Sequence, residues 1–261
     1  MNKIGILFFA LSTMGIGTLS AQTADSTQTS PWTKEGFAGL KLTQVSLTNW
    51  AAGGDNAVGF NLQFNYFANY KKAKHLWNNR LELDYGLNKT KSDGTKKTND
   101  KIYLSSTYGY EIAKNWYASG LMTFQTQFAK GYDYNVDPDV FISRFMSPGY
   151  LTTGLGLTWN PKNWITATFS AISWRGTFVS SKILSDEGSF GVDPGEHLFS
   201  EMGGNLKVEV KYEFLKNMTI YSRVDLFSNY LEDPQNVDVR WDVQLNMTVN
   251  KWFSANISTN L

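Results

Sequence analysis

Apolar and polar residues alternate along several long stretches of this chain, and this pattern restricts the fold more than any other feature. In residues 58–70 the even positions are apolar, whereas most odd positions are polar. The alternation returns in residues 77–88, 102–112, 206–214 and 237–249. Because successive side chains of a β-strand point to opposite faces, each stretch predicts a strand with one apolar and one polar face.

Soluble β-sandwiches also contain such strands, but three further features favour a membrane barrel. The predicted strands have about 10 to 13 residues, whereas strands of globular proteins average about five or six and a tilted membrane strand needs about 9 to 11. Short and long connections alternate, and aromatic residues gather at the strand ends. We therefore predict an all-β fold, a transmembrane antiparallel up-and-down β-barrel in residues 36–261.

Short turns of similar sequence separate the predicted strands at one end. Residues 113–116, 161–164 and 250–252 each combine Lys and Asn with a final Trp. Trp prefers the boundary between membrane and water, so these turns predict an interface girdle on the periplasmic side, whereas a sandwich core would hold Trp in mid-strand. The predicted girdle consists of Trp77, Trp116, Trp164 and Trp252, joined by Tyr70, Tyr110, Trp159 and Phe214.

The long connections are rich in Gly, Asp, Asn, Ser and Pro, which is typical of exposed loops. They are predicted at 89–101, 129–149, 180–200 and 231–236, with a shorter one at 51–56.

These divisions give eleven strands, beginning near Gly39 and still alternating at Leu261. Known bacterial single-chain barrels have even strand numbers. An open barrel would also leave unpaired backbone groups in lipid, each at a cost of several kcal/mol. We therefore expect twelve strands in the complete barrel, with both termini periplasmic and the last strand missing from this sequence.

The N-terminus has the features of a secretory signal peptide. Lys3 gives it a positive start, an apolar run continues to about Leu19, and Leu19-Ser20-Ala21 offers a cleavage site before Gln22. The apolar run has roughly 16 residues, fewer than the roughly 20 of a spanning helix, so a signal peptide is favoured over a membrane anchor. Residues 1–21 are thus predicted to be removed, and 22–35 to form a flexible segment.

Three stretches of the chain resemble one known family. Gln44–Gly54, with the sequence QVSLTNWAAGG, is similar to the opening signature of uncharacterised outer-membrane barrels of Bacteroidota, a family catalogued as a domain of unknown function. Ile142–Leu151 and residues 169–173 fit the same family, and the likeness covers nearly the whole mature chain. The resemblance implies an outer-membrane location and a further closing strand, and it supplies no catalytic residues.

The composition argues against several classes of function. The 24 basic and 23 acidic residues nearly balance and no basic block occurs, so no nucleic-acid partner is expected. The lack of cysteine excludes disulfides, thiolate catalysis and cysteine metal sites. Neither a nucleophile elbow, a P-loop nor a His-Glu-x-x-His motif occurs. We therefore predict no enzyme and no cofactor.

Only two histidines are available for acid–base chemistry. His75 is predicted in a periplasmic turn, where a solvated role is the simplest interpretation. His197 follows Glu196 in a predicted external loop with further acidic residues, and it is the best candidate for a barrel hydrolase. An ordinary charged loop is favoured, because spacing alone defines no catalytic geometry.

One stretch has the spacing of a weak calcium site. Its oxygen-bearing residues alternate as in the first half of a calcium loop, at Asp133, Asn135, Asp137 and Asp139. However, Pro138 stands where such loops need Gly, and Arg144 where they need Glu. A polar external loop is therefore favoured over a metal site.

The mid-strand charged residues are predicted to line the lumen, because an Arg or Lys facing lipid at mid-depth would cost about 2–4 kcal/mol. The predicted lumen-lining residues are Arg80, Glu82, Asp84, Glu111, Lys207, Glu209, Lys211, Glu213, Arg223, Asp225, Asp238, Arg240 and Asp242. Since basic and acidic residues are interleaved in this set, cross-strand ion pairs are expected to fill or narrow the lumen.

Three functions follow in order of preference. The first is a narrow outer-membrane channel for small polar solutes. The second is a structural barrel whose external loops bind a surface protein partner. The third is a barrel hydrolase. In each case the chain would contact membrane lipid and depend on the barrel-assembly machinery for insertion.

Overall fold

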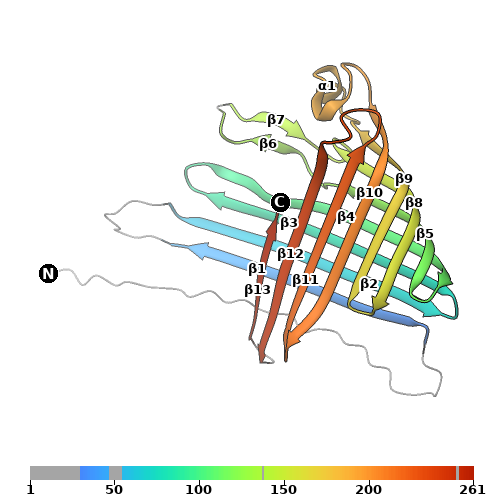
Figure 1. Ribbon diagram of the computed structural model, residues 1–261. Helices are drawn as coiled ribbons and strands as arrows, with labels where there is room; N and C mark the ends of the chain where they lie inside the picture. The colour runs from blue at the N-terminus through green and yellow to red at the C-terminus, as the bar shows by residue number, and fades with distance from the viewer. Residues whose placement is uncertain (1–29, 47–54, 137, 251–252) are drawn as a thin grey trace.

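The fold is one large antiparallel sheet, seen in a computed structural model that describes residues 30–46, 55–136, 138–250 and 253–261 (Figure 1). Its eleven strands are joined in the order β1-β2-β3-β4-β5-β8-β9-β10-β11-β12-β13. The predictions of an all-β chain and of eleven antiparallel strands in this sheet are therefore confirmed. The bounds of these strands are β1 Trp32–Val45, β2 Ala57–Lys72, β3 His75–Thr90, β4 Gly94–Ala113, β5 Trp116–Thr126, β8 Gly149–Lys162, β9 Ile165–Phe178, β10 Leu198–Leu215, β11 Met218–Asn229, β12 Val237–Asn250 and β13 Phe253–Asn260.

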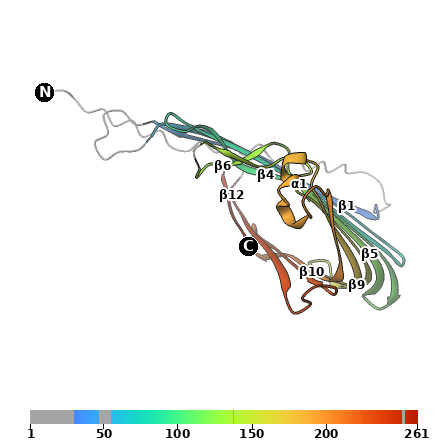
Figure 2. The same cartoon turned by 90° about the horizontal axis from the view of Figure 1, so that it is seen from above.

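The sheet curls back on itself, so that β1–β5 and β10–β12 form two facing walls joined through β8 and β9 (Figure 2). We call the concave side the inner face and the convex side the outer face. In the described residues β1 and β13 are the two edges of the sheet and do not pair with each other. The predicted barrel closure is thus not found.

The two faces differ sharply in polarity, as the alternation predicts. Large apolar side chains are exposed on the outer face, among them Val58 at 59 %, Leu155 at 66 % and Ile172 at 64 %. Charged and hydroxyl side chains are buried on the inner face, for example Arg80 and Thr158. This arrangement reverses that of a soluble β-sandwich, whose apolar side chains pack between its sheets.

No helix in the described part of the chain is both long and apolar enough to cross a membrane.

The tight turns at one end share a local mechanism. Asn115 and Asn217 both have φ of 66°, a left-handed conformation that Asn tolerates better than most residues. Their backbone N–H groups donate to Glu111 Oε1 at 3.2 Å and to Glu213 Oε1 at 3.1 Å. Each Glu therefore stabilises the turn that follows it, and this end of the sheet is called the turn end.

Two predicted boundaries differ from the observed strands. Residues 89–101, predicted as a long loop, mostly belong to β3 and β4, which are joined by residues 91–93 alone. The Lys, Asn and Asp residues there resemble a loop in composition, but their backbone continues the ladder beyond the apolar part of both strands. β1 begins at Trp32, within the segment predicted to be flexible and ahead of Gly39.

At the opposite end, called the loop end, two connections fold into small structures. Residues 129–149 contain the hairpin β6 Gly131–Asp133 and β7 Val140–Ser143, and residues 180–200 contain α1 Lys182–Asp186 and the 3₁₀ turn η1 Ser189–Gly191. The helical segment has its own core of Val179, Leu184 and Val192. Most of the predicted loop at 51–56 lies outside the described residues, whereas 231–236 does connect β11 to β12.

Gly156 should be among the positions of the sheet most sensitive to substitution. A Cβ there would lie 1.9 Å from the backbone oxygen of Phe169, beside a register shift between β8 and β9. We expect Gly156→Ala to lower the free energy of unfolding by about 1–3 kcal/mol, because the strands must separate. Urea unfolding followed by tryptophan fluorescence measures the effect.

Gly120→Ala is the matched control, because its Cβ would meet no atom closer than 3.6 Å. Equal stability of the two variants would contradict the close strand approach at Gly156.

Candidate functional site: the charged interior

Charged side chains gather on the inner face of the sheet. Of the residues predicted to line a lumen, four are buried, namely Arg80, Glu82, Lys207 and Arg223. Others are half-buried, namely Asp84, Glu111, Glu209, Lys211, Asp225 and Asp242, and three are exposed, namely Glu213, Asp238 and Arg240. Glu111 and Glu213 accept hydrogen bonds from the turns that follow them, whereas most of the others belong to one network of ion pairs and hydrogen bonds.

Glu82 on β3 is the centre of this network. Its Oε1 accepts a hydrogen bond from Arg223 Nη1 on β11 at 2.9 Å, and its Oε2 accepts one from Lys101 Nζ on β4 at 2.9 Å. Arg80 forms an ion pair with the same carboxylate, and Arg223 forms another with Asp242. One carboxylate is therefore shared by three cations from both walls.

A second carboxylate extends the network toward β10. Glu209 lies 3.1 Å from Lys207 Nζ and accepts a hydrogen bond from the Tyr221 hydroxyl at 3.0 Å. Lys207 Nζ also donates to Ser105 Oγ on β4, across the interior, at 2.6 Å. Because Lys207 is only 2 % exposed, these contacts replace nearly all of its hydration.

Aromatic rings support the cations of the network. The guanidinium carbon of Arg80 lies 3.7 Å from the centre of the Tyr221 ring, and that of Arg223 lies 4.0 Å from the Tyr103 ring. Such cation–π contacts strengthen as water is excluded. The interior at this level is therefore filled by side chains that touch across the two walls.

A second cluster, of which the sequence predicted only Asp238 as a lining residue, lies nearer the loop end. Arg175 on β9 binds Glu201 through two hydrogen bonds of 2.5 and 2.6 Å and reaches Asp238 Oδ2 at 2.5 Å. The register shift between β8 and β9 leaves Ala171 and Ile172 both exposed, so the simple alternation fails just before Arg175. Glu201 directly follows the loop predicted at 180–200. The local signal was an Arg flanked by Trp174 and Gly176 within an otherwise apolar and hydroxyl-bearing strand.

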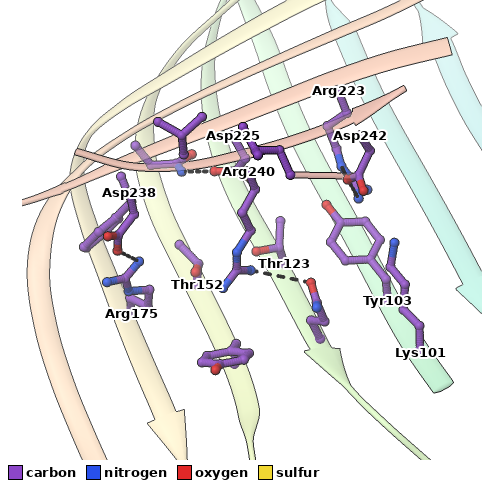
Figure 3. Close-up of a pocket in the computed structure, with 16 residues that line it drawn as sticks. Lys101, Tyr103, Thr123, Thr152, Arg175, Arg223, Asp225, Asp238, Arg240 and Asp242 are labelled. Carbon is purple, nitrogen blue, oxygen red and sulfur yellow. Dashed lines mark hydrogen bonds and ion pairs between the residues drawn. The ribbon is translucent and has the colours of Figure 1, made fainter. Parts of the chain in front are cut away.

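Between these clusters lies a cavity of about 370 Å³ (Figure 3). One wall carries Tyr103 and Thr123, the other carries Asp225 and Arg240, and Thr152 lies on the joining strand β8. The remaining polar lining includes Lys101, Gln125, Arg175, Asn205, Arg223, Asp238 and Asp242. The Glu82 network thus separates this cavity from the turn end of the interior, since Arg223 and Lys101 belong to both.

Aromatic residues form a band at the turn end. Trp77, Trp116 and Trp164 are each more than a third exposed on the outer face. The ring of Trp116 lies 6.4 Å from Trp159. Trp32, which was not predicted as a member, lies 5.6 Å from Trp77. Of the predicted partners, Tyr110 and Phe214 are also exposed and Tyr70 is half-buried, whereas Trp252 lies outside the described residues.

The two histidines have structural partners. His75 Nδ1 lies 2.7 Å from the Tyr108 hydroxyl, and its ring packs against Tyr110, so it belongs to the aromatic band. His197 Nδ1 lies 2.7 Å from the carbonyl oxygen of Val179, to which it donates, and a backbone hydrogen bond joins the same two residues. These contacts hold the helical segment of the loop end in place.

The calcium-like stretch has no assembled ligand cage in the part of the chain that the structure describes. Asp133 Oδ1 accepts hydrogen bonds from the backbone and side-chain nitrogens of Asn135, both at 3.0 Å. Asp139 lies after a gap in the described residues, and Asp137 is that gap. Among the described residues, no cluster of three or more His, Cys, Asp or Glu side chains is arranged to hold a metal ion.

Asp55 fixes the loop end of the first strands. Its Oδ2 accepts a hydrogen bond of 2.7 Å from the backbone N–H of Ser92 in the β3–β4 connection. Hydrogen bonds from the side chain and backbone of Ser92 keep the pKa of Asp55 below its ordinary value. The carboxylate form thus ties the start of β2 to the neighbouring connection.

Part of the chain is similar to a known protein family. Residues 42–132 match a family model described as a protein of unknown function (DUF3078). This range covers β2 to β5 and the part of β1 that begins at Leu42, so it includes Arg80, Glu82 and Lys101 of the network. This part of the chain is therefore similar to an uncharacterised domain family. No curated protein matches the chain.

Removal of the Glu82 charge should destabilise the protein strongly. In Glu82→Gln the buried cations Arg80 and Arg223 would face each other without the shared carboxylate. We expect the free energy of unfolding to fall by about 3–5 kcal/mol, the usual cost of breaking a buried ion pair from one side. Urea unfolding of the refolded protein measures it.

Glu35→Gln is the matched control, since Glu35 pairs with Lys211 but is about half exposed. Its expected effect is at most about 1 kcal/mol. A loss for Glu82→Gln as small as that of the control would show that the network contributes little to stability.

Proposed function

We propose that this protein is an outer-membrane β-barrel with a narrow, ion-paired lumen for small polar solutes. The observation that carries the proposal is the reversed polarity of the sheet, with exposed apolar side chains outside and buried charges inside. In water, an outer face with Leu155 and Ile172 each about two-thirds exposed would associate or aggregate. A surrounding bilayer removes that cost, while a polar lumen accepts the charges.

The aromatic band supports the same placement. Trp32, Trp77, Trp116 and Trp164 lie at the turn end, as the interfacial Trp of outer-membrane barrels do. The turn end would face the periplasm and the loop end the cell exterior. The proposal includes a signal peptide in residues 1–21, insertion by the barrel-assembly machinery and an origin in Bacteroidota.

In lipid the backbone groups at both sheet edges need partners. β1 and β13 run in the same direction, because neighbouring strands of the sheet are antiparallel and β1 and β13 are the first and last of eleven. The edges would pair with each other as parallel strands, or a twelfth strand between them would pair antiparallel with both. Closure of the barrel between β1 and β13 is part of the proposal.

A channel function is supported by the layout of the interior. A polar cavity of about 370 Å³ lies on the loop-end side of the Glu82 network. The network narrows the path beyond it, since Glu82 and Arg223 meet across the two walls at 2.9 Å. Solutes would enter the cavity and pass the network through small movements of its flexible side chains, which limits passage to small polar molecules.

The folded loop end favours a second candidate function, binding of a surface protein partner. Apolar side chains are exposed there, namely Ile142 on β7, Phe145 between β7 and β8, and Ile183 on α1. Exposed apolar groups on loops with an ordered framework are typical of interaction sites. A barrel hydrolase is supported less, because His197 is engaged with the backbone of Val179.

Planar-bilayer recording tests the channel directly. The refolded full-length protein should give a small but defined single-channel conductance in KCl. In the double variant Glu82→Ala/Arg223→Ala the conductance should rise, because the two side chains that meet across the interior are shortened. Removal of both partners leaves neither of these two charges buried without the other, while Arg80 keeps Glu209 at 4.0 Å.

The control is Lys182→Ala/Asp186→Ala, which removes an exposed ion pair on α1 far from the network. It should leave the conductance unchanged. A wild-type protein that inserts into the bilayer without any conductance would overturn the channel proposal and leave partner binding as the favoured function.

A further inference from the structure

The charged side chains that line the cavity at the loop-end side of the network differ in how they are paired. Four basic side chains line it, namely Lys101, Arg175, Arg223 and Arg240, and three acidic ones, namely Asp225, Asp238 and Asp242. Lys101 pairs with Glu82, Arg175 with Glu201 and Asp238, and Arg223 with Glu82 and Asp242. In the described residues, Arg240 is the one of these cations with no carboxylate oxygen within 4 Å. Asp225 stands opposite it across the β11–β12 ladder, so the two charges are neighbours without a direct ion pair.

The charged end of the Arg240 side chain lies in the cavity. Figure 3 shows its side chain extending from β12 toward Thr123 on β5 and Thr152 on β8. Its nearest polar contact is a weak one, with Nη1 3.5 Å from the Gln125 side-chain oxygen, and its guanidinium carbon lies 5.0 Å from the centre of the Tyr150 ring. Most of its five N–H donors therefore remain for a ligand.

The other lining groups suit a hydroxylated molecule. Thr123 and Thr152 offer hydroxyl groups, and Asp225 offers a carboxylate of which Oδ1 accepts a hydrogen bond from Asn205. Hydroxyl groups of a ligand can donate to Asp225 and exchange hydrogen bonds with both Thr. The cavity volume of about 370 Å³ lies within the range of about 300–1,000 Å³ typical of small-molecule sites.

We propose that this cavity binds a small hydroxylated carboxylate, such as a sugar acid, with its carboxylate on the Arg240 guanidinium. Arg presents a planar fork that matches a carboxylate with two parallel hydrogen bonds. The inference names a solute class for the proposed channel and rests on that function. Selection among solutes would take place in this cavity, before the Glu82 network. There the solute would replace contacts with water by contacts with Arg240 and the hydroxyl groups of the lining.

Titration calorimetry of the full-length protein in detergent tests this, with D-glucuronate as the probe and D-glucose as the uncharged match. Glucuronate should bind and glucose should bind at least roughly tenfold more weakly, because glucose lacks the charged partner of Arg240. This comparison uses the wild-type protein alone and does not depend on how a variant folds. Equal binding of the two sugars, or no binding of glucuronate, would overturn the proposal.

Variants of Arg240 test whether its guanidinium binds the glucuronate carboxylate. Arg240→Gln should weaken glucuronate binding by roughly ten- to hundredfold, and Arg240→Lys by less, because Lys keeps the charge but loses the fork. Arg144→Gln, on the exposed segment between β7 and β8, is the matched control and should bind like wild type. Unchanged binding in Arg240→Gln with a native circular dichroism spectrum would contradict the assignment.

The same preparations separate the two proposals. If the protein conducts ions but does not bind glucuronate, the proposed solute class is wrong and the channel proposal stands. If the protein binds glucuronate through Arg240 but does not conduct ions, the proposed binding site stands and the channel proposal is wrong.

Discussion

The meeting of Glu82 and Arg223 across the two walls of the sheet is the interaction on which the rest of the interior depends. These side chains belong to β3 and β11 and lie 2.9 Å apart, although 141 positions separate them in sequence. Burial of either charge alone would cost several kcal/mol. Around this pair, Arg80, Lys101 and Asp242 complete their own contacts, so the two walls are held at a distance that side chains can bridge.

The sequence predicted the strands and their faces well, because alternation is a local property of the backbone. It placed Glu82 and Arg223 on the polar face but could not pair them, since a period of two gives the direction of a side chain and no partner on the opposite wall. The prediction was wrong at residues 89–101, where strand and loop share the same polar composition. It missed Arg175 because a register shift precedes that residue.

The arrangement of the interior connects stability with the proposed function. The network near the middle of the strands supplies cross-wall contacts. In the cavity on its loop-end side, Arg240 has no direct ion pair and lies beside Asp225 of the neighbouring strand. A fully neutralised interior would give no reason for an anionic solute to enter. An interior with many unpaired cations would repel itself and open the walls. One guanidinium with available donors, among lining cations that are otherwise ion-paired, satisfies both conditions.

The proposed outer-membrane barrel requires that the apolar outer face of the sheet contacts lipid. Because the chain has no cysteine, single cysteines along β2 can each carry one fluorophore. Reconstituted in vesicles with a quencher dissolved in the lipid, labels at positions 58, 60 and 62 should be quenched strongly, and labels at 59, 61 and 63 weakly. Equal quenching at both sets, or protection of the apolar positions from lipid and water alike, would contradict the account.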